Sequence, residues 1–303
     1  MKSIVQSFTK LALPAAALML AGALAPQALY AGGNSSGTPV PPVPEFSTES
    51  NKARGLEIAL YMDLFDTGWK DQYSTSRMTL YDARGDSVQR SVVQMILELA
   101  EGDKSIVKFR SPAEIKGVAA LTHEHPDATD DNWLYLPASK RVRRISGANK
   151  TASFQGTEFT YEDLSSLVIT KYDWRFLEED ELTSDGAEQP VYKLEARPNY
   201  RNTGYSRLVV HVNRDLWRIE RIDFYDKAGR MLKVLENSDW TQLHGRFWRA
   251  QRLEMKNVQT KKRTVIEVKN LLVNLGLYKS PKTGKQRSNL TDRHFTTRSL
   301  ESR

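Results

Sequence analysis

Residues 110–164 read RSPAEIKGVAALTHEHPDATDDNWLYLPASKRVRRISGANKTASFQGTEFTYEDL. Short apolar runs alternate here with turn-forming Gly, Pro, Asn and Asp residues, and aromatic residues gather near residues 133–135 and 154–161. Apolar runs bounded by turn residues predict short β-strands. The segment contains no group of side chains typical of a reaction centre. We therefore interpret it as sheet, turns and an aromatic lining.

A period of two residues extends on both sides of this segment. Turn signals such as residues 83–86 and 226–229 separate the runs, and many strands joined by short turns predict an antiparallel sheet. A short helical turn is expected at residues 160–166, and residues 293–300 are a candidate last edge strand. The other predicted strands are residues 77–82, 87–99, 105–110, 118–122, 133–136, 142–145, 168–174, 191–196, 206–212, 217–225, 231–235, 247–257 and 264–271.

Residues 50–65, ahead of the strands, have a helical pattern. Ser50 can cap the start of this helix, and Gly68 follows its end. We predict an amphipathic helix with one apolar face, made of Ala53, Leu56, Ala59, Leu60 and Leu64. The fold class is then α+β, mainly antiparallel β, with a sheet large enough to curl. Curling without closure leaves a concave face that the helix is expected to cover.

The N-terminus is typical of a secretory signal peptide. Lys2 and Lys10 precede or flank an apolar run at residues 11–24, and small residues follow as far as Ala31. We predict that residues 1–31 are a signal peptide cleaved near Ala31, with Ala28 and Ala25 as weaker cleavage positions. An uncleaved membrane anchor is the alternative.

The remaining chain divides by composition. Residues 32–48 are rich in Gly, Ser and Pro, which predicts a flexible tether. Residues 49–303 are then expected to form a single domain. The sequence contains no cysteine, so it has neither a disulfide nor the Cys that bacterial lipoproteins need for lipid attachment.

The charge of the chain argues against nucleic-acid binding. The whole chain carries +7; removal of residues 1–31 takes away Lys2 and Lys10 and no acidic residue, which leaves +5. The basic residues are spread among Asp and Glu without a concentrated basic face. A modest positive charge favours contact with anionic head groups or an acidic partner.

No motif predicts catalysis or a cofactor. The sequence contains no Gly-x-Ser-x-Gly elbow, no Cys nucleophile and no phosphate-binding P-loop. The acidic residues near positions 63–71 and 178–181 are irregularly spaced, so we interpret them as solvated surface rather than paired catalytic carboxylates. We therefore predict no catalytic residue, no enzyme activity and no cofactor.

His123 and His125 are candidate metal ligands, because two-residue spacing places both on one side of a strand. Together with Asp127, Asp130 or Asp131 they include ligand types that zinc accepts. The segment is rich in Pro and Asp, however, and is more typical of a solvated loop. No metal is predicted.

Two sets of residues are candidates for contact with a ligand. Arg141, Arg143 and Arg144 form a basic cluster that suits a phosphate, a carboxylate or a partner protein; the alternative is an exposed strand whose charges pair with nearby acids. The second set is apolar or aromatic and is predicted to line a cavity, with ordinary sheet core as the alternative. Its members are Met95, Leu97, Phe109, Trp133, Tyr135, Phe154, Phe159 and Tyr161.

Three motifs carry a resemblance to a known family. They are Ser111-Pro112 with Lys116-Gly117, residues 133–137 with Arg143-Arg144-Ile145, and residues 154–164. Together they resemble the periplasmic outer membrane lipoprotein-sorting proteins of the LolA/LolB-like superfamily. Residues 217–226, 229–235 and 245–269 are also similar to this family, so the resemblance covers roughly residues 50–300.

The resemblance implies a half-open curved β-barrel with a helical lid over an apolar cavity. It implies a periplasmic, non-catalytic carrier that shields lipid or lipoprotein acyl chains on their way toward the outer membrane. Transient membrane contact and an inner-membrane transporter of the RND or MMPL type would follow as partners. The lid would be the helix at residues 50–65 or the turn at residues 160–166. The alternative is an adaptor subunit of an exporter that transfers nothing.

Overall fold

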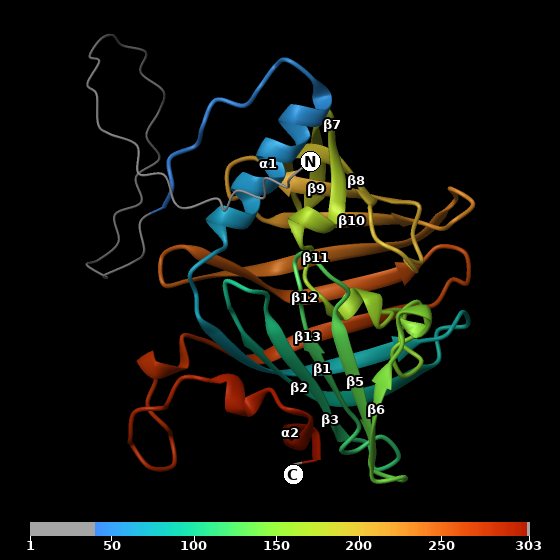
Figure 1. The fold of residues 1–303 in the computed structure, drawn as a ribbon, viewed down its shortest axis with the longest axis vertical. Coiled ribbons are helices and arrows are strands. Elements are labelled where there is room, and N and C mark those ends of the chain that lie inside the picture. Colours follow the sequence, from blue (N-terminus) through green and yellow to red (C-terminus); the bar gives the residue numbers. More distant parts are fainter. Residues whose placement is uncertain (1–39, 302–303) are drawn as a thin grey trace, which may run out of the picture. The chain divides into compact units, whose positions relative to one another are not determined.

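The structure is a computed structural model that describes residues 40–301 (Figure 1). The predicted signal peptide and the first part of the predicted tether lie outside these residues. The described residues form thirteen strands in one sheet, in the order β6-β5-β4-β3-β2-β1-β13-β12-β11-β10-β9-β8-β7. The strands are β1 Asp71–Tyr81, β2 Ser87–Leu97, β3 Lys104–Ser111, β4 Ala119–His123, β5 Asp131–Leu136, β6 Arg141–Ile145, β7 Tyr172–Ser184, β8 Ala187–Pro198, β9 Arg207–Asn213, β10 Ile219–Tyr225, β11 Met231–Leu243, β12 Phe247–Asn257 and β13 Arg263–Val273.

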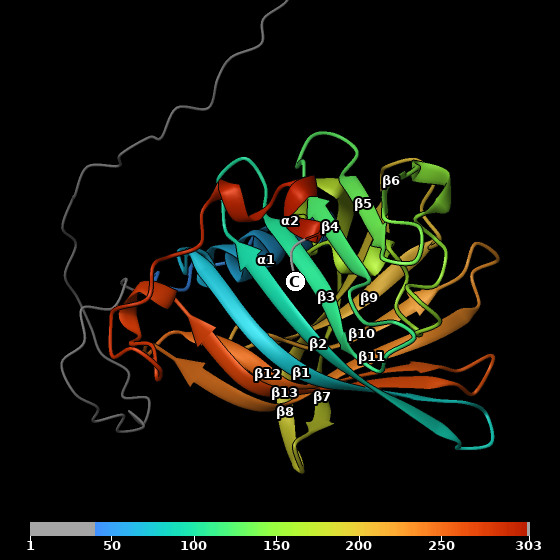
Figure 2. The same ribbon diagram turned by 90° about the horizontal axis from the view of Figure 1, so that it is seen from below.

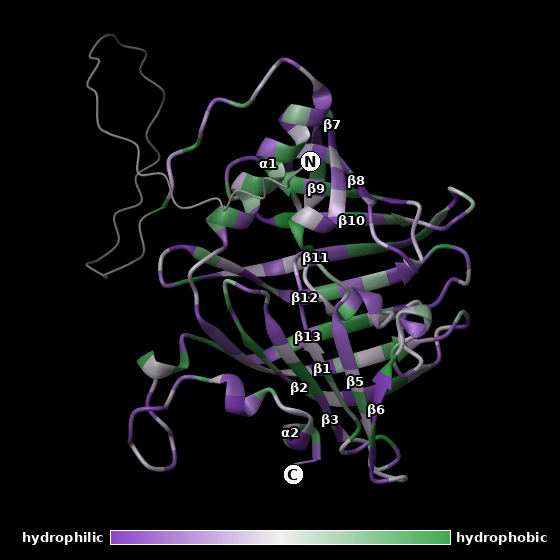
Figure 3. Ribbon diagram, viewed as in Figure 1, coloured by the Kyte–Doolittle hydropathy of each residue, from purple (hydrophilic) through white to green (hydrophobic). Residues whose placement is uncertain are grey.

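Every neighbouring pair in the sheet is antiparallel, as the sequence predicts. The β1–β2 hairpin shows how the local sequence sets the register. Asp82 Oδ1 accepts hydrogen bonds from the backbone N–H groups of Arg84 and Asp86, and Gly85 has a φ of 95°. This turn pairs Leu80 with Val88. Apolar and polar residues then alternate along the strands (Figure 3).

The sheet is curved but open. β1 pairs with both β2 and β13, which joins the N-terminal strands to the rest, and the end strands β6 and β7 do not pair with each other. Figure 2 shows the strands curling around a concave face. The prediction of a half-open curved β-barrel is confirmed in part: the sheet is antiparallel and curved, but it stays open because its end strands β6 and β7 do not meet.

Helix α1 (Asn51–Phe65) packs on β7 and has the predicted limits. Ser50 Oγ accepts a hydrogen bond from Ala53 N at 3.1 Å, as expected for an N-cap. At Gly55 the helix meets the β7 backbone: a Cβ there would lie 2.4 Å from Phe176 N. Only glycine permits this approach.

The predicted apolar face of α1 is correct only in part: Ala59 is buried and Ala53 is half-buried, but the three predicted leucines are exposed. The buried residues are Gly55, Ile58, Ala59, Tyr61 and Met62. Leu56, Leu60 and Leu64 are exposed by 41, 49 and 51%. The leucines outweigh Gly55 in any hydrophobic pattern, yet the close approach at Gly55 decides which side of the helix faces β7.

Residues just before α1 pack against it. Phe46 contacts the rings of Tyr61, Tyr192 and Trp217, and Tyr61 donates its O–H to Pro41 O at 2.6 Å. The predicted tether thus ends in residues that pack on the domain.

Residues 146–171 connect β6 to β7 and are called the crossing segment. This segment contains the short 3-10 helices η1 (Gly147–Asn149), η2 (Glu162–Leu164) and η3 (Ile169–Lys171). The predicted helical turn at residues 160–166 corresponds to η2. In Figure 1 the segment (green to yellow-green) lies in front of β12 and β13, on the concave face. Contacts of Glu158 with Asn257 on β12 and Thr264 on β13 confirm this placement.

Residues 274–301, called the C-terminal segment, cover the opposite, outer face of β2–β5. The expected edge strand at residues 293–300 is wrong: η5 (Asp292–His294) and α2 (Thr297–Glu301) form there. The segment buries Leu275, Leu290, Phe295 and Leu300 against the sheet. Those apolar residues occur at irregular spacing, so they pack as anchors of a loop rather than as one side of a strand.

Several strands are longer than predicted, among them β1, β7, β8 and β11. β7 extends through the acidic residues 178–181, and β11 extends to Leu243. In β7 the acids are exposed and Lys193 on β8 pairs with Glu178 and Asp180 at 2.8 and 2.9 Å. Exposed hairpin strands of this kind lack the apolar alternation by which strands are recognised. No helix within residues 40–301 combines the length and the apolar character needed to cross a bilayer.

Candidate ligand-binding site

The concave face of the sheet is apolar across both of its halves. One buried cluster lies under α1 on β7–β10 and β12, and another lies on β1–β5. Ile266 on β13 packs against both clusters and so makes the apolar surface continuous. The buried sheet residues of this surface are Met78, Val92, Val107, Phe109, Ala120, Leu134, Trp174, Phe176, Leu194, Ala196, Leu208, Val210, Val212, Ile222, Phe224 and Met255.

Aromatic side chains of the crossing segment cover this surface. Phe154 stacks on Phe109 of β3, with ring centroids 5.5 Å apart, and meets Tyr161 edge-on at 5.5 Å. Phe159 packs in the cluster under α1. The crossing segment therefore occupies the space above the sheet where an apolar ligand would lie.

The middle of the crossing segment is folded on itself and attached to the sheet through side chains. Phe154 N donates to Phe159 O, and Tyr161 N donates to Ala152 O, which closes a small hairpin. Glu158 N donates to Thr264 Oγ1 at 3.0 Å, and its carboxylate accepts from Asn257 Nδ2 at 2.9 Å. Side-chain attachment can break without disturbing the strand ladder.

A buried ion pair fixes the end of this hairpin. Lys233 Nζ on β11 lies 2.5 Å from Asp163 Oδ2 and donates to Glu158 O at 3.0 Å. The Tyr205 hydroxyl donates to Asp163 Oδ1 at 2.7 Å. Burial, together with the charge of Asp163, raises the pKa of Tyr205 well above its usual value, so its hydroxyl remains a donor.

The other side of the crossing segment is held by the β4–β5 loop. The Glu124 carboxylate accepts hydrogen bonds from Ser166 N at 2.5 Å and Ser166 Oγ at 2.6 Å. Glu124 is only 6% exposed, and burial raises the pKa of its carboxyl. Lys171 forms an ion pair with Asp130 of the same loop. Polar contacts thus close both margins of an otherwise apolar site.

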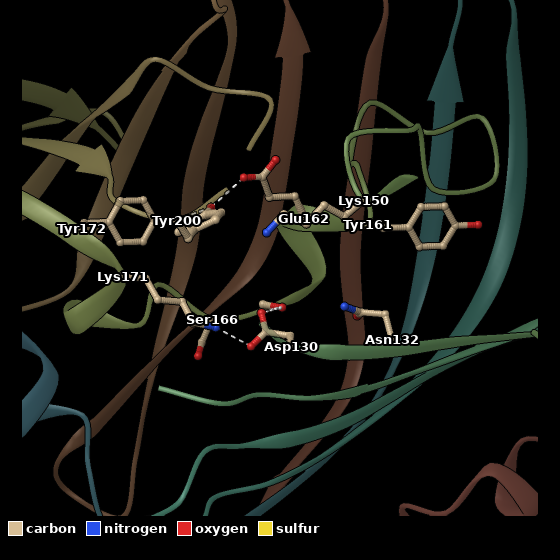
Figure 4. Close-up of a pocket in the computed structure, with 10 residues that line it drawn as sticks. Asp130, Asn132, Lys150, Tyr161, Glu162, Ser166, Lys171, Tyr172 and Tyr200 are labelled. Atoms are coloured by element: carbon tan, nitrogen blue, oxygen red, sulfur yellow. Dashed lines mark hydrogen bonds and ion pairs between the residues drawn. The ribbon is translucent and has the colours of Figure 1, made fainter. Parts of the chain in front are cut away.

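A small polar pocket lies where these margins meet (Figure 4). Its volume is about 20 Å³, enough for a water molecule. Tyr200 O–H donates to Glu162 at 2.6 Å, and burial raises the pKa values of Tyr172 and Tyr200. The pocket is lined by Asp130, Asn132, Lys150, Tyr161, Glu162, Ser165, Ser166, Lys171, Tyr172 and Tyr200.

The structure divides the eight predicted cavity residues between the two faces of the sheet. Phe109, Phe154 and Tyr161 meet in one cluster of the concave side, with Phe159 in the neighbouring cluster. The other four pack on the outer face beneath the C-terminal segment; they are Met95, Leu97, Trp133 and Tyr135. A cavity lined by all eight is therefore excluded in this fold.

Strand parity is the reason for this division. Leu134 of β5 pairs with Ala120 and belongs to the concave side, so its neighbours Trp133 and Tyr135 point to the outer face. The large size of Trp133 and Tyr135 favours the cavity side of the sheet in the sequence, and this prediction is wrong. The concave residue in this run is the smaller Leu134.

The basic cluster is divided by the same rule. Arg143 pairs with Leu134, whereas Arg144 pairs with Trp133, so the two side chains lie on opposite faces of β6. Arg141, Arg143 and Arg144 are exposed, and Arg144 forms an ion pair with Asp131. Arg141 and Arg143 are left on the side of the concave face.

The two histidines have separate partners. His123 Nε2 contacts Phe295 O of the C-terminal segment at 2.7 Å, and burial lowers the pKa of His123. His125 Nε2 lies 3.2 Å from Asp131 Oδ2. Within residues 40–301, no group of three or more His, Asp or Glu side chains is placed to hold a metal ion.

Sequence reasoning missed the polar margins. The sequence predicts a solvated loop around Glu124 and Asp130, gives Asp163 only as part of the motif at residues 154–164, and does not point to Lys150 or Lys233. The sequence carries no local signal for them, because their partners are distant in the chain: Asp163 and Lys233 are 70 residues apart.

Known proteins share this architecture. A family model described as "Uncharacterized protein" matches residues 101–302. A crystal structure named as an outer membrane lipoprotein-sorting protein domain, from Vibrio parahaemolyticus, is 37% identical and has a TM-score of 0.75. It covers 83% of this chain, and this chain covers all of it. The chain belongs to the outer membrane lipoprotein-sorting protein family. The resemblance of its motifs to that family is thereby confirmed.

Two further structures support the family's fold. A DUF1329 family protein from Desulfovibrio piger is 29% identical with a TM-score of 0.73, and the match covers 83% of this chain and 99% of that one. A LolA superfamily protein from Nitrosomonas europaea has 18% identity and a TM-score of 0.60, over 81% of this chain and 98% of that one, and so shares the fold. No curated protein sequence matches the chain.

Proposed function

We propose that this chain is a periplasmic, non-catalytic carrier that shields lipid or lipoprotein acyl chains in its concave face during transfer toward the outer membrane. One observation carries the proposal. The apolar concave surface spans both halves of an open sheet, and what covers it is α1 and the crossing segment, which are not strands of the sheet. Membership of the outer membrane lipoprotein-sorting family supports the same function.

Uptake requires the covering elements to move. Phe154, Phe159 and Tyr161 are 1, 8 and 7% exposed, so they fill the site in the closed form. Burial of a large apolar side chain contributes about 1.5–3 kcal/mol. An acyl chain contributes about 0.8 kcal/mol per buried methylene, or about 10 kcal/mol for a long chain. The free energy from burying the three aromatic side chains is therefore similar to that from burying one acyl chain. An acyl chain can then replace these side chains and can later be released.

The wider role rests on the family resemblance. We infer that the chain is exported to the periplasm, contacts membranes transiently and works with an inner-membrane transporter of the RND or MMPL type. A modest positive charge is consistent with approach to anionic head groups.

Native mass spectrometry of protein taken from the periplasm tests the proposal. A carrier is expected to retain lipid or lipoprotein in near-stoichiometric amount, and the delipidated protein is expected to take up lipid from vesicles. If the protein carries no lipid and takes none up, the carrier function is wrong and the alternative of an exporter adaptor remains.

A further inference from the structure

The polar pocket borders both apolar clusters of the concave face. Tyr161 lines the pocket and is buried with Phe154 and Phe109, while Tyr172 lines the pocket and packs against the cluster under α1. A polar cavity next to an apolar surface suits an amphiphile: the head group would lie in the polar cavity and the acyl chains on the apolar surface.

The acidic groups of the pocket already have donors. Asp130 accepts hydrogen bonds from His125 N and Ser165 Oγ and pairs with Lys171. Glu162 accepts from the Tyr200 hydroxyl at 2.6 Å and from Gly204 N at 2.8 Å. These carboxylates therefore do not call for a cationic ligand.

Lys150 and Asn132 each bring to the pocket a donor for which no acceptor is found among the described residues. Among the described residues, Lys150 Nζ lies over the Tyr200 ring, 4.0 Å from its centroid, and has no carboxylate within 4 Å, although the charges of Glu162 and Asp130 act on it from farther away. Asn132 Oδ1 accepts from Thr122 Oγ1 at 2.8 Å, which leaves the Asn132 amide N–H₂ for another acceptor. Figure 4 places Lys150 and Asn132 on different sides of the pocket. A ligand that supplies acceptor oxygens between them would satisfy both.

We propose that this pocket binds the anionic group, a phosphate or a carboxylate, of an amphiphile whose acyl chains lie on the concave face, with Lys150 as its main ligand. This inference rests on the proposed carrier function. Arg143, exposed on neighbouring β6, pairs with Leu134, two residues along β5 from Asn132, and so adds positive charge on the same side of the sheet as the pocket. Lys150 is half-buried, and this burial lowers the pKa of its ammonium group, while the charges of Glu162 and Asp130 act in the opposite direction.

Because the pocket is small, a head group can bind only if the crossing segment moves away from the sheet. A volume of about 20 Å³ holds a water molecule but not a whole phosphate group. Lys150 belongs to the crossing segment itself, so entry of an anion must displace the segment that also covers the apolar surface.

Lys150→Gln tests the site, with Lys116→Gln as the matched control, because Lys116 is exposed and lies outside the pocket. Binding is measured by native mass spectrometry with three probes: a short-chain phosphatidylglycerol, the diacylglycerol with the same chains, and inorganic phosphate. A charged hydrogen bond contributes about 1.5–3 kcal/mol, so Lys150→Gln is expected to weaken phosphatidylglycerol binding roughly tenfold or more. Diacylglycerol binding should not change, Lys116→Gln should bind like the wild type, and Lys150→Arg should restore part of the loss.

The outcomes separate this site from the carrier function. If Lys150→Gln binds phosphatidylglycerol as the wild type does, or loses both lipids equally, the head-group site is wrong while the carrier function stands. If the wild type binds neither lipid, the carrier function fails. If inorganic phosphate binds the wild type in the absence of lipid, and Lys150→Gln loses this binding, the ligand would be a free anion. Equal melting temperatures of the variants exclude misfolding as the cause.

Discussion

Lys233 and Asp163 form an ion pair at 2.5 Å, with side chains only 2 and 5% exposed, between the sheet and the crossing segment. Removal of one partner from a buried pair leaves the other charge without compensation. We therefore predict that Lys233→Met lowers the free energy of unfolding by about 3–5 kcal/mol and speeds amide exchange in residues 153–163. Urea unfolding and hydrogen-exchange mass spectrometry measure the two effects.

Lys193→Met is the control for this prediction. Lys193 pairs with Glu178 and Asp180 on the exposed β7–β8 hairpin, where removal of an ion pair costs about 1 kcal/mol or less. Equal effects of the two substitutions would show that the buried pair does not secure the crossing segment.

Gly55→Ala tests how closely α1 must lie on β7. Alanine favours a helix by about 1 kcal/mol over glycine, but the new Cβ would meet Phe176 N at 2.4 Å. We expect α1 to be displaced, with a net loss of about 1–3 kcal/mol in stability and stronger binding of an apolar fluorescent dye to the uncovered concave face. Leu60→Ala on the exposed side of α1 should change neither. Unaltered dye binding in Gly55→Ala would mean that α1 does not limit access.

We predict that the free energy of unfolding depends on pH through Asp103. Burial, followed by the charge of Glu124, raises the pKa of Asp103 to about 7. The unfolded state ionises near pH 4 and the folded state only near pH 7, so this group weakens the fold as the pH rises between those values. Asp103→Asn should stabilise the protein by on the order of 1–3 kcal/mol at pH 8 and hardly at pH 4.

Urea unfolding of wild type and variant at the two pH values measures this difference. Asp127→Asn, at an exposed position of the β4–β5 loop, should show no such dependence. A gain for Asp103→Asn that is equal at pH 4 and pH 8 would contradict burial of the charged form as its cause.

Phe295→Ala tests the attachment of the C-terminal segment to the outer face. Phe295 is 1% exposed and packs in the cluster with Leu97, Ile106 and Leu121. Removal of a buried Phe side chain costs about 3–5 kcal/mol. Thermal unfolding should report this loss, while lipid uptake per folded molecule stays unchanged because the concave face is not involved. Reduced uptake by the folded variant would show that the outer face contributes to the site.

The sheet was largely predictable from the sequence, whereas the choice of face was not. Alternation and turn residues locate most strands because each run buries one side, as in the β1–β2 hairpin. Which side becomes concave depends on pairing with distant strands. Leu134 therefore lies inside and Trp133 outside, although the larger aromatic residue suggested the reverse.

The helix and the candidate site show the same limit. Ser50 and Gly68 predict the ends of α1 by local rules, yet the single close approach at Gly55 turns its leucines outward. Phe154 and Tyr161, two of the predicted cavity residues, are buried on the concave side, and their contact with a ligand stays a prediction. The ion pair of Lys233 with Asp163 could not be predicted from the sequence, because the two residues are 70 positions apart.

Movement of the crossing segment away from the sheet is the central requirement of a carrier with this fold. The absence of cysteine allows a clean test with Glu158→Cys and Asn257→Cys, whose native side chains are 2.9 Å apart. A short, reducible thiol cross-linker then ties the crossing segment to β12. Glu178→Cys with Lys193→Cys, opposite each other on β7 and β8, gives a cross-link that leaves the segment free.

Uptake of a fluorescent phospholipid from vesicles by these two cross-linked proteins is the most direct measurement. We predict that the 158–257 cross-link abolishes uptake, that reduction restores it, and that the 178–193 cross-link has no effect. Uptake at the wild-type rate with the 158–257 cross-link in place would contradict the account.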